Sequence, residues 1–184
     1  MKTTDKPELM DQNELQLLEI LDKAVQEETL KKHMEGVIQR VEKALQDAPD
    51  AMMSWEPIPL NLYSQKLPDE IKSCWVFNLR KYKTTGAERH PNSIQRMMSY
   101  KGTGDFQTKP GETWQSNFLE SDRDKDVSKR WLSIPVNVWH QGVVSEQNWV
   151  VLSFHTVEVS ELIEERADES NHGKMHSQKY VDKK

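Results

Sequence analysis

Apolar residues recur at three- and four-residue steps in the first quarter of the chain. From Asp11 to about residue 48 these positions hold Leu15, Leu18, Leu21, Val25, Leu30, Met34, Val37, Val41 and Leu45. This spacing places them on one face of amphipathic helix. Asp11, three residues before Glu14, predicts an N-terminal cap. The pattern leaves open whether this is one helix or two joined near 27–29. It also leaves open whether the apolar stripe packs on the rest of the chain or on a second copy.

The pattern changes between about residues 52 and 162. Short runs of Trp, Val, Ile, Phe and Tyr are separated there by Gly, Pro, Asn and Asp, which predicts strands and turns. The expected strands are 73–82, 93–100, 104–108, 113–119, 131–135 and 148–159. Many short strands behind a helical front predict a mainly β, antiparallel barrel or jelly roll. We therefore expect a helical extension over 1–50, a barrel over 51–163 and a disordered polar tail over 164–184.

Composition excludes several classes of function. The net charge is −5, and no Lys/Arg stripe is interleaved with aromatic residues, so we expect no nucleic-acid partner. No run approaches the roughly 20 apolar residues of a membrane span, and the N-terminus lacks the apolar core of a signal peptide. A cytoplasmic protein is expected. The single cysteine, Cys74, rules out an intrachain disulfide and lies in an apolar run, which predicts a buried, inert thiol.

Two short clusters carry the residues with metal-binding chemistry. The first is Glu88-Arg-His90-Pro-Asn-Ser-Ile-Gln95, followed after six residues by Gly102. The second, further along the chain, is Pro135-Val-Asn137-Val-Trp-His140. Both lie in the strand-rich zone, where facing strands would direct their side chains toward one point.

These clusters resemble the two motifs of the cupin superfamily of small β-barrels. The first cupin motif runs His, one residue, His, three or four residues, Glu, six residues, Gly, and the second runs Pro, one residue, Gly, two residues, His. Position by position, the first His becomes Glu88, the second stays His90, the Glu becomes Gln95 and the last His stays His140. Asn137 replaces the glycine of the second motif. The resemblance covers roughly residues 55 to 160 and implies a cupin-like double-stranded β-helix, a jelly-roll barrel.

The resemblance also implies a metal site. Glu88, His90 and His140 would hold a divalent ion of Fe, Mn, Ni or Zn, because two imidazoles and a carboxylate suit any of these and leave coordination positions open. Gln95 would complete the coordination shell or tune it, and Arg96 would orient a substrate. In an alternative register His90 is the first histidine and Asn92 the second. The glutamate position then falls on Arg96 or Met97, and metal binding is not expected.

Three functions remain open on this basis. The first is a metal-dependent enzyme of dioxygenase or isomerase type that acts on a small organic acid or sugar derivative. The second is a metal-free enzyme resembling the sugar epimerases, with His90 or His140 as general base and Tyr100 as acid. The third is a non-catalytic module that binds or senses a small molecule. His155, if it faces the barrel interior, is either an acid/base group or a satisfied core histidine. A homodimer is expected, while the substrate and the identity of the ion are not predicted.

Overall fold

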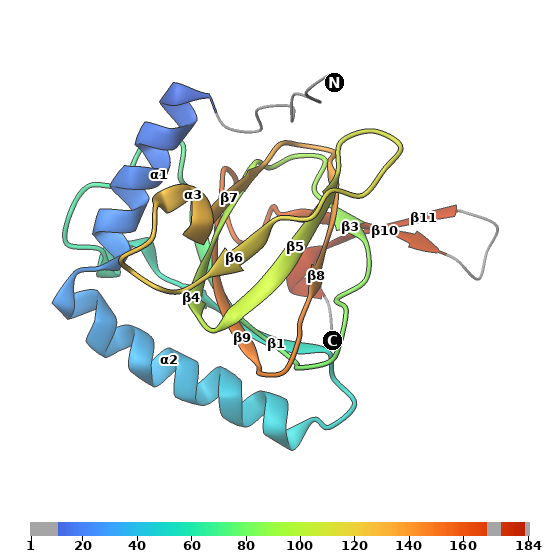
Figure 1. Cartoon of the computed structure of the whole chain (residues 1–184), viewed down its shortest axis with the longest axis horizontal. Coiled ribbons are helices and arrows are strands. Elements are labelled where there is room, and N and C mark those ends of the chain that lie inside the picture. Colours follow the sequence, from blue (N-terminus) through green and yellow to red (C-terminus); the bar gives the residue numbers. More distant parts are fainter. Residues whose placement is uncertain (1–10, 169–173, 183–184) are drawn as a thin grey trace, which may run out of the picture.

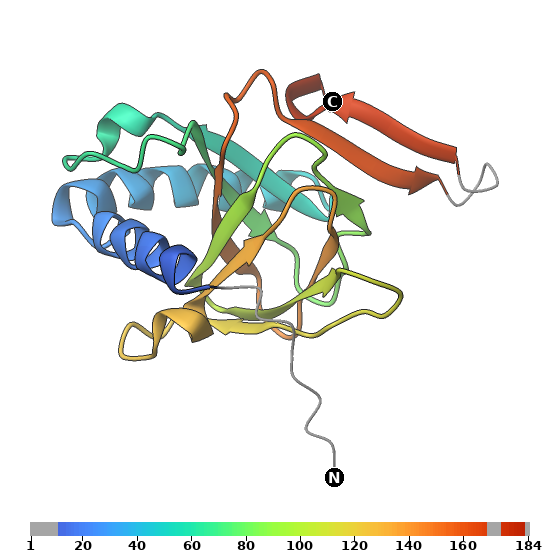
Figure 2. The ribbon, with the colours of Figure 1, turned by 90° about the horizontal axis from the view of Figure 1, so that it is seen from above.

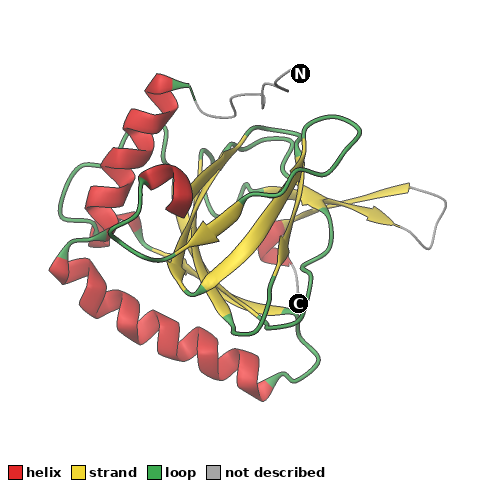
Figure 3. Ribbon diagram, viewed as in Figure 1, coloured by secondary structure: helices red, strands yellow, loops and turns green. Residues whose placement is uncertain are grey.

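Two antiparallel β-sheets face each other, and a pair of helices covers one of them (Figures 1 and 3). The computed structural model describes residues 11–168 and 174–182. The five-stranded sheet has the order β1 (Met53–Ile58), β2 (Ser73–Leu79), β9 (Trp149–His155), β4 (Gln95–Lys101), β7 (Trp131–Ile134). The six-stranded sheet has the order β11 (Lys174–Lys179), β10 (Ile163–Asp168), β3 (Glu88–Arg89), β8 (Trp139–Val143), β5 (Thr103–Lys109), β6 (Phe118–Glu120). The mainly β architecture predicted from the sequence is confirmed.

The N-terminal pattern forms two helices, α1 (Gln12–Val25) and α2 (Glu28–Asp47). The side chain of Asp11 caps α1 by accepting a hydrogen bond from the Glu14 amide, as the sequence predicts. The apolar stripe packs on the outer face of the five-stranded sheet, so it is not available to a second copy of the chain. The homodimer stays a prediction. Within the described residues, neither helix combines the length and the apolar character that crossing a bilayer requires.

A buried ion pair fixes α1 to the barrel. Asp22 accepts two hydrogen bonds from the guanidinium of Arg130, at 2.5 and 2.7 Å, and a third from the indole of Trp131 at 2.8 Å. Arg130 ends α3 (Val127–Arg130), a single helical turn, and Trp131 begins β7. The helices are therefore joined to the barrel by polar contacts as well as by apolar packing.

Period-two alternation in the central strands separates two cores. In β9, Val150, Leu152 and Phe154 face the helices, whereas the residues between them face the other sheet. The second core lies between the sheets, where buried aromatic residues of both meet, including Trp75, Trp149 and Phe106. At Gly102 the chain turns from β4 into β5 with φ of 92°, a conformation that favours glycine.

The end of the chain differs from the prediction. The sequence suggested a disordered tail from residue 164, yet Ile163–Asp168 and Lys174–Lys179 pair as an antiparallel hairpin, and β10 continues onto β3. The hairpin extends beyond the barrel (Figure 2). Four of the six residues of β10 are charged, so the strand lacks the apolar period by which strands are recognised, which explains the error. Residues 169–173 and 183–184 of the predicted tail lie outside the described part of the chain.

Candidate metal centre

Glu88, His90 and His140 come together between the two sheets. One potential ligand atom from each lies within 4.8 Å of the others, and the side chains are buried. The strand register explains this, because Glu88 of β3 is directly opposite His140 of β8. Their closest atoms, Glu88 Oε1 and His140 Nε2, are 3.6 Å apart. Ligands about 2.1 Å from a tetrahedral ion are roughly 3.4 Å from one another, so this pair already has the spacing that an ion needs.

Both histidine rings are oriented by a hydrogen bond from Nδ1 to the backbone. His90 Nδ1 lies 2.8 Å from the carbonyl oxygen of Ile163, and His140 Nδ1 lies 3.0 Å from that of Val138. Because a carbonyl oxygen only accepts, each Nδ1 must carry the proton, which leaves the lone pair of a neutral ring on Nε2. His140 Nε2 is buried and has no hydrogen-bond partner among the described residues. Histidine ligands of metals are usually held in this way by a second hydrogen bond.

The turn that carries the second motif explains why asparagine can replace glycine. Asn137 has φ of 62°, a left-handed conformation that asparagine tolerates better than other residues with a side chain. Its amide donates a 3.0 Å hydrogen bond to the carbonyl of His90, which joins the two motifs through the backbone. The replacement therefore keeps the backbone geometry that positions His140.

A second polar group lies on the opposite sheet. His155 packs edge-on to His90 with ring centres 5.2 Å apart. Its nitrogens bond the hydroxyls of Ser93 and Ser153, at 3.1 and 3.0 Å. Burial lowers the pKa of His155 well below its ordinary value, and His90 and His140 lower it further against the opposing effect of Glu88. His155 does face the interior, but as a neutral histidine with both nitrogens occupied, which favours the core role over the acid/base role.

Gln95 belongs to this second group. Its side-chain nitrogen donates to Ser153 at 2.9 Å, and its oxygen, also buried, has no partner within the described part of the chain. The sequence predicted that Gln95 would complete the metal shell or tune it. The structure instead attaches it to the sheet opposite Glu88 and His140.

Arg96 and Tyr100 are not part of the site. They share a face of β4, and that face is covered by the helices. Arg96 is held by the carboxylates of Glu14 and Glu70. Both assignments, Arg96 as the substrate-orienting group and Tyr100 as the acid, are therefore corrected. The reason is the period of two along β4, which points Gln95 inward and both of these residues outward.

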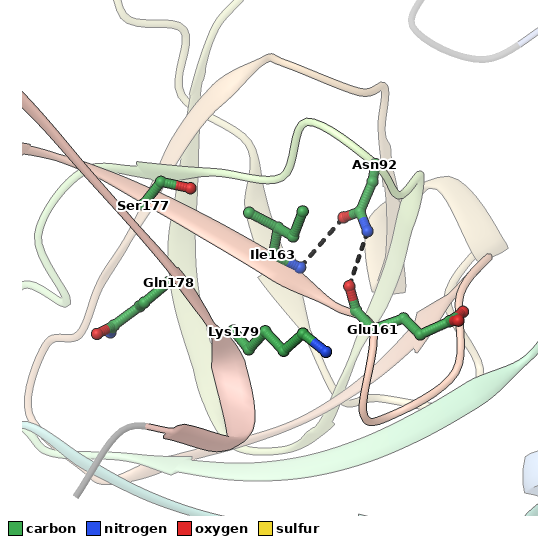
Figure 4. A pocket seen from close by; sticks show the side chains of 6 residues that line it. All are labelled: Asn92, Glu161, Ile163, Ser177, Gln178 and Lys179. Carbon is green, nitrogen blue, oxygen red and sulfur yellow. Dashed lines mark hydrogen bonds between the residues drawn. The ribbon is translucent and has the colours of Figure 1, made fainter.

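The alternative register brings no ligand set together. The side chain of Asn92 bonds the backbone of the β10 region, accepting from the Ile163 amide and donating to the Glu161 carbonyl. Asn92, Glu161 and Ile163 are among the residues that line a surface pocket of about 430 Å³ (Figure 4). None of Glu88, His90 and His140 lines that pocket. Asn92 instead holds the segment whose Ile163 carbonyl orients His90.

Sequence reasoning missed three polar residues of the interior, all in the segment interpreted as a tail. Arg166 binds Glu88 Oε2 at 2.5 Å, and Glu164 binds Arg166. Tyr180 is buried beside Trp55 and Trp75. Burial raises the pKa of Tyr180 well above its ordinary value, and the carboxylates of Glu88 and Glu164 add to this. An aromatic residue within an otherwise polar segment was the one signal that this segment folds onto the barrel.

No family model and no curated protein matches the sequence. Among solved structures, the chain is similar to the capsular polysaccharide assembling protein CapF from Staphylococcus aureus. The identity is 14% and the TM-score 0.45, with 69% of this chain and 32% of CapF covered. It is also similar to an oxalate oxidase bound to the substrate analogue glycolate, at 12% identity and a TM-score of 0.44, covering 58% and 52% of the two chains. For KdgF from Halomonas sp. the values are 8% and 0.41, covering 59% and 84%.

The chain thus corresponds to about a third of CapF and half of the oxalate oxidase. All three are proteins of the cupin fold. In this chain two antiparallel sheets face each other and the residues of the two motifs meet between them, which agrees with the jelly-roll architecture expected from the sequence.

Proposed function

We propose that this protein is a metal-dependent cupin in which Glu88, His90 and His140 hold one divalent ion. The observation that carries the proposal is that both histidine rings are held by backbone carbonyls through Nδ1, while one potential ligand atom from each of Glu88, His90 and His140 lies within 4.8 Å of the others. Two imidazoles and one carboxylate suit Fe, Mn, Ni or Zn. A bound ion would polarise a substrate oxygen and stabilise negative charge that develops on it.

The chain's own residues supply orientation and exclusion of water. Glu88, His90 and His140 are 8%, 3% and 1% exposed, so bulk water does not compete for their lone pairs. Phe106 stacks on the His140 ring at 5.7 Å and fixes its plane. The core between the sheets, which surrounds these residues, consists mainly of apolar side chains. We propose dioxygenase- or isomerase-type chemistry on a small organic acid or sugar derivative.

A metal-free epimerase is less well supported. That interpretation needs an acid opposite the histidine base, and Tyr100 lies on the helix-covered face of β4. The non-catalytic binding module remains the second candidate, because the same buried ligand set could retain an ion without turnover. Oxygen-uptake and isomerisation assays with small carboxylic acids and sugars separate the two, since the module would bind the ion and convert none of them.

Elemental analysis and metal titration of the full chain test the proposal. We expect about one ion of Mn, Fe, Ni or Zn per chain, and almost none in the His140→Ala and His90→Ala variants. The matched control is His33→Ala, because His33 is an exposed histidine on α2. At an ion concentration a hundred times the Kd, binding should stabilise the folded state by about 2.7 kcal/mol, seen as a rise in Tm. A chelator-treated wild type that takes up none of the four ions, with no rise in Tm, would overturn the proposal.

A further inference from the structure

Arg166 stands in one row with two of the three candidate metal ligands. In the register of the six-stranded sheet, Arg166 of β10 is opposite Glu88 of β3, and Glu88 is opposite His140 of β8. Residues opposite one another in antiparallel strands have side chains on the same face. The guanidinium, the carboxylate and the imidazole therefore lie side by side across three strands, on the interior face.

The two oxygens of the Glu88 carboxylate lie near different residues, Arg166 and His140. Its Oε2 lies 2.5 Å from Arg166 Nη2, while its Oε1 lies 3.6 Å from His140 Nε2. One oxygen is therefore engaged by the guanidinium and the other is directed toward the place where an ion would meet His140. A carboxylate held through one oxygen can bind an ion with the other and keeps its orientation while it does so.

Arg166 is itself fixed by two further contacts. Its Nε donates to Glu164 Oε1 at 2.7 Å, and its Nη1 donates to the carbonyl of Thr85 at 2.9 Å. The Glu164 side chain is fully buried. Three different nitrogens of one planar group are thus bonded in three directions, which fixes the position of the guanidinium plane.

The backbone at Gly86 passes close to the guanidinium of Arg166. Gly86 has φ of 79°, and a Cβ atom at this position would lie 3.1 Å from Arg166 Nη1. Such a contact is tighter than ordinary van der Waals packing, so a side chain here would push against the guanidinium. The absence of a side chain at Gly86 therefore leaves room for the guanidinium of Arg166.

Resting on the proposed function, we infer that Arg166 is a positioning residue of the metal centre: held by Glu164 and the Thr85 carbonyl, it orients Glu88 so that Oε1 faces the ion. Strand β10 of the C-terminal hairpin therefore contributes a residue to the site. Arg166 acts through Glu88 and does not itself bind the ion.

The matched control is Arg89→Met. Arg89 neighbours Arg166 across the same pair of strands but faces outward, where its Nε binds Glu165 Oε2 at 2.8 Å and its guanidinium lies over Trp139. Arg166→Met and Arg89→Met thus each remove a guanidinium bonded to a carboxylate, on opposite faces of one sheet. Only the first of these changes reaches Glu88.

The experiment titrates Zn²⁺ and Co²⁺ into the chelator-treated full chain. We expect Arg166→Met to weaken Zn²⁺ binding by about 10- to 100-fold and to change the visible absorption of bound Co²⁺, which reports ligand geometry. Arg89→Met should leave both within about twofold, as expected for a partly exposed pair. Arg166→Lys, which keeps the charge but not the three-way fork, should recover part of the affinity. Gly86→Ala should give an intermediate loss with Arg166 still present.

The outcomes separate this inference from the proposed function. If the wild type binds the ions and a folded Arg166→Met protein binds them equally well with an unchanged Co²⁺ spectrum, the positioning role is overturned while the metal site stands. If the wild type binds neither of these ions, and takes up no Mn, Fe or Ni either, both the inference and the proposed function are overturned. Circular dichroism checks folding. If Arg166→Met does not fold, Arg166→Lys and Gly86→Ala decide, and wild-type affinity and spectrum in both would overturn the inference.

Discussion

Replacing Asp22 with alanine should lower the stability of the fold more than replacing an exposed charged residue does, because it breaks the ion pair that joins α1 to the barrel. Asp22 accepts four side-chain hydrogen bonds, two from Arg130 and one each from Trp131 and Gln26. The Arg130 side chain is 4% exposed, so Asp22→Ala leaves a buried cation without its carboxylate. Removing one partner of a buried pair typically costs about 3–5 kcal/mol, a large part of the roughly 5–15 kcal/mol that stabilises a domain. For a chain of this size the Tm should fall by roughly 6–20 °C.

Urea unfolding followed by tryptophan fluorescence measures this cost. The control is Asp47→Ala, which breaks an exposed ion pair with Lys43 on α2 and should cost less than about 1 kcal/mol. The double variant Asp22→Ala/Arg130→Met removes both charges and should be no less stable than Asp22→Ala alone, because the uncompensated cation is gone. If Asp22→Ala costs no more than Asp47→Ala, the pair does not join α1 to the barrel as described.

Two further predictions concern single positions. Asn137→Gly should bind metal and unfold in urea like the wild type. Asn137→Ala should lose about 1–2 kcal/mol of stability, because residue 137 would still have to adopt a φ of 62°. Equal stability of the two variants would show that the left-handed turn is not required. Burial raises the pKa of the Cys74 thiol to about 12, although hydrogen bonds from Tyr63 and the Trp75 amide oppose this. Its folded pKa exceeds the unfolded value of about 8.5, so stability is lost as the pH rises between these values, and the thiol should resist iodoacetamide at pH 8 until the chain unfolds. Rapid alkylation of the folded protein would contradict that.

The parts of the fold with a regular apolar period were predictable. The stripe from Leu15 to Leu45 specified the helices, and runs such as 73–82 and 148–159 indicated the central strands. Glu88 and Arg89 form a strand of only two residues, too short for any period to show. That strand nevertheless carries a candidate ligand, which is why spacing within the motif was more informative than local pattern.

The site itself was predicted in part. The spacing of the two clusters selected Glu88, His90 and His140, which the structure brings together. The first cluster also suggested Arg96, as a cation that would orient a substrate. Gln95 and Arg96 are consecutive in one strand, however, and consecutive side chains of a strand point to opposite faces of the sheet. Arg166 could not be found in this way. It reaches Glu88 through the pairing of β10 with β3, a long-range register that local sequence does not encode.

All three candidate ligands belong to the six-stranded sheet or to the segment that leaves it, whereas Gln95, Ser153 and His155 belong to the other sheet. A change in the separation of the sheets would therefore widen or narrow the space in front of an ion without altering the distances among its ligands. Admission of a substrate and retention of the ion can vary independently in such an arrangement.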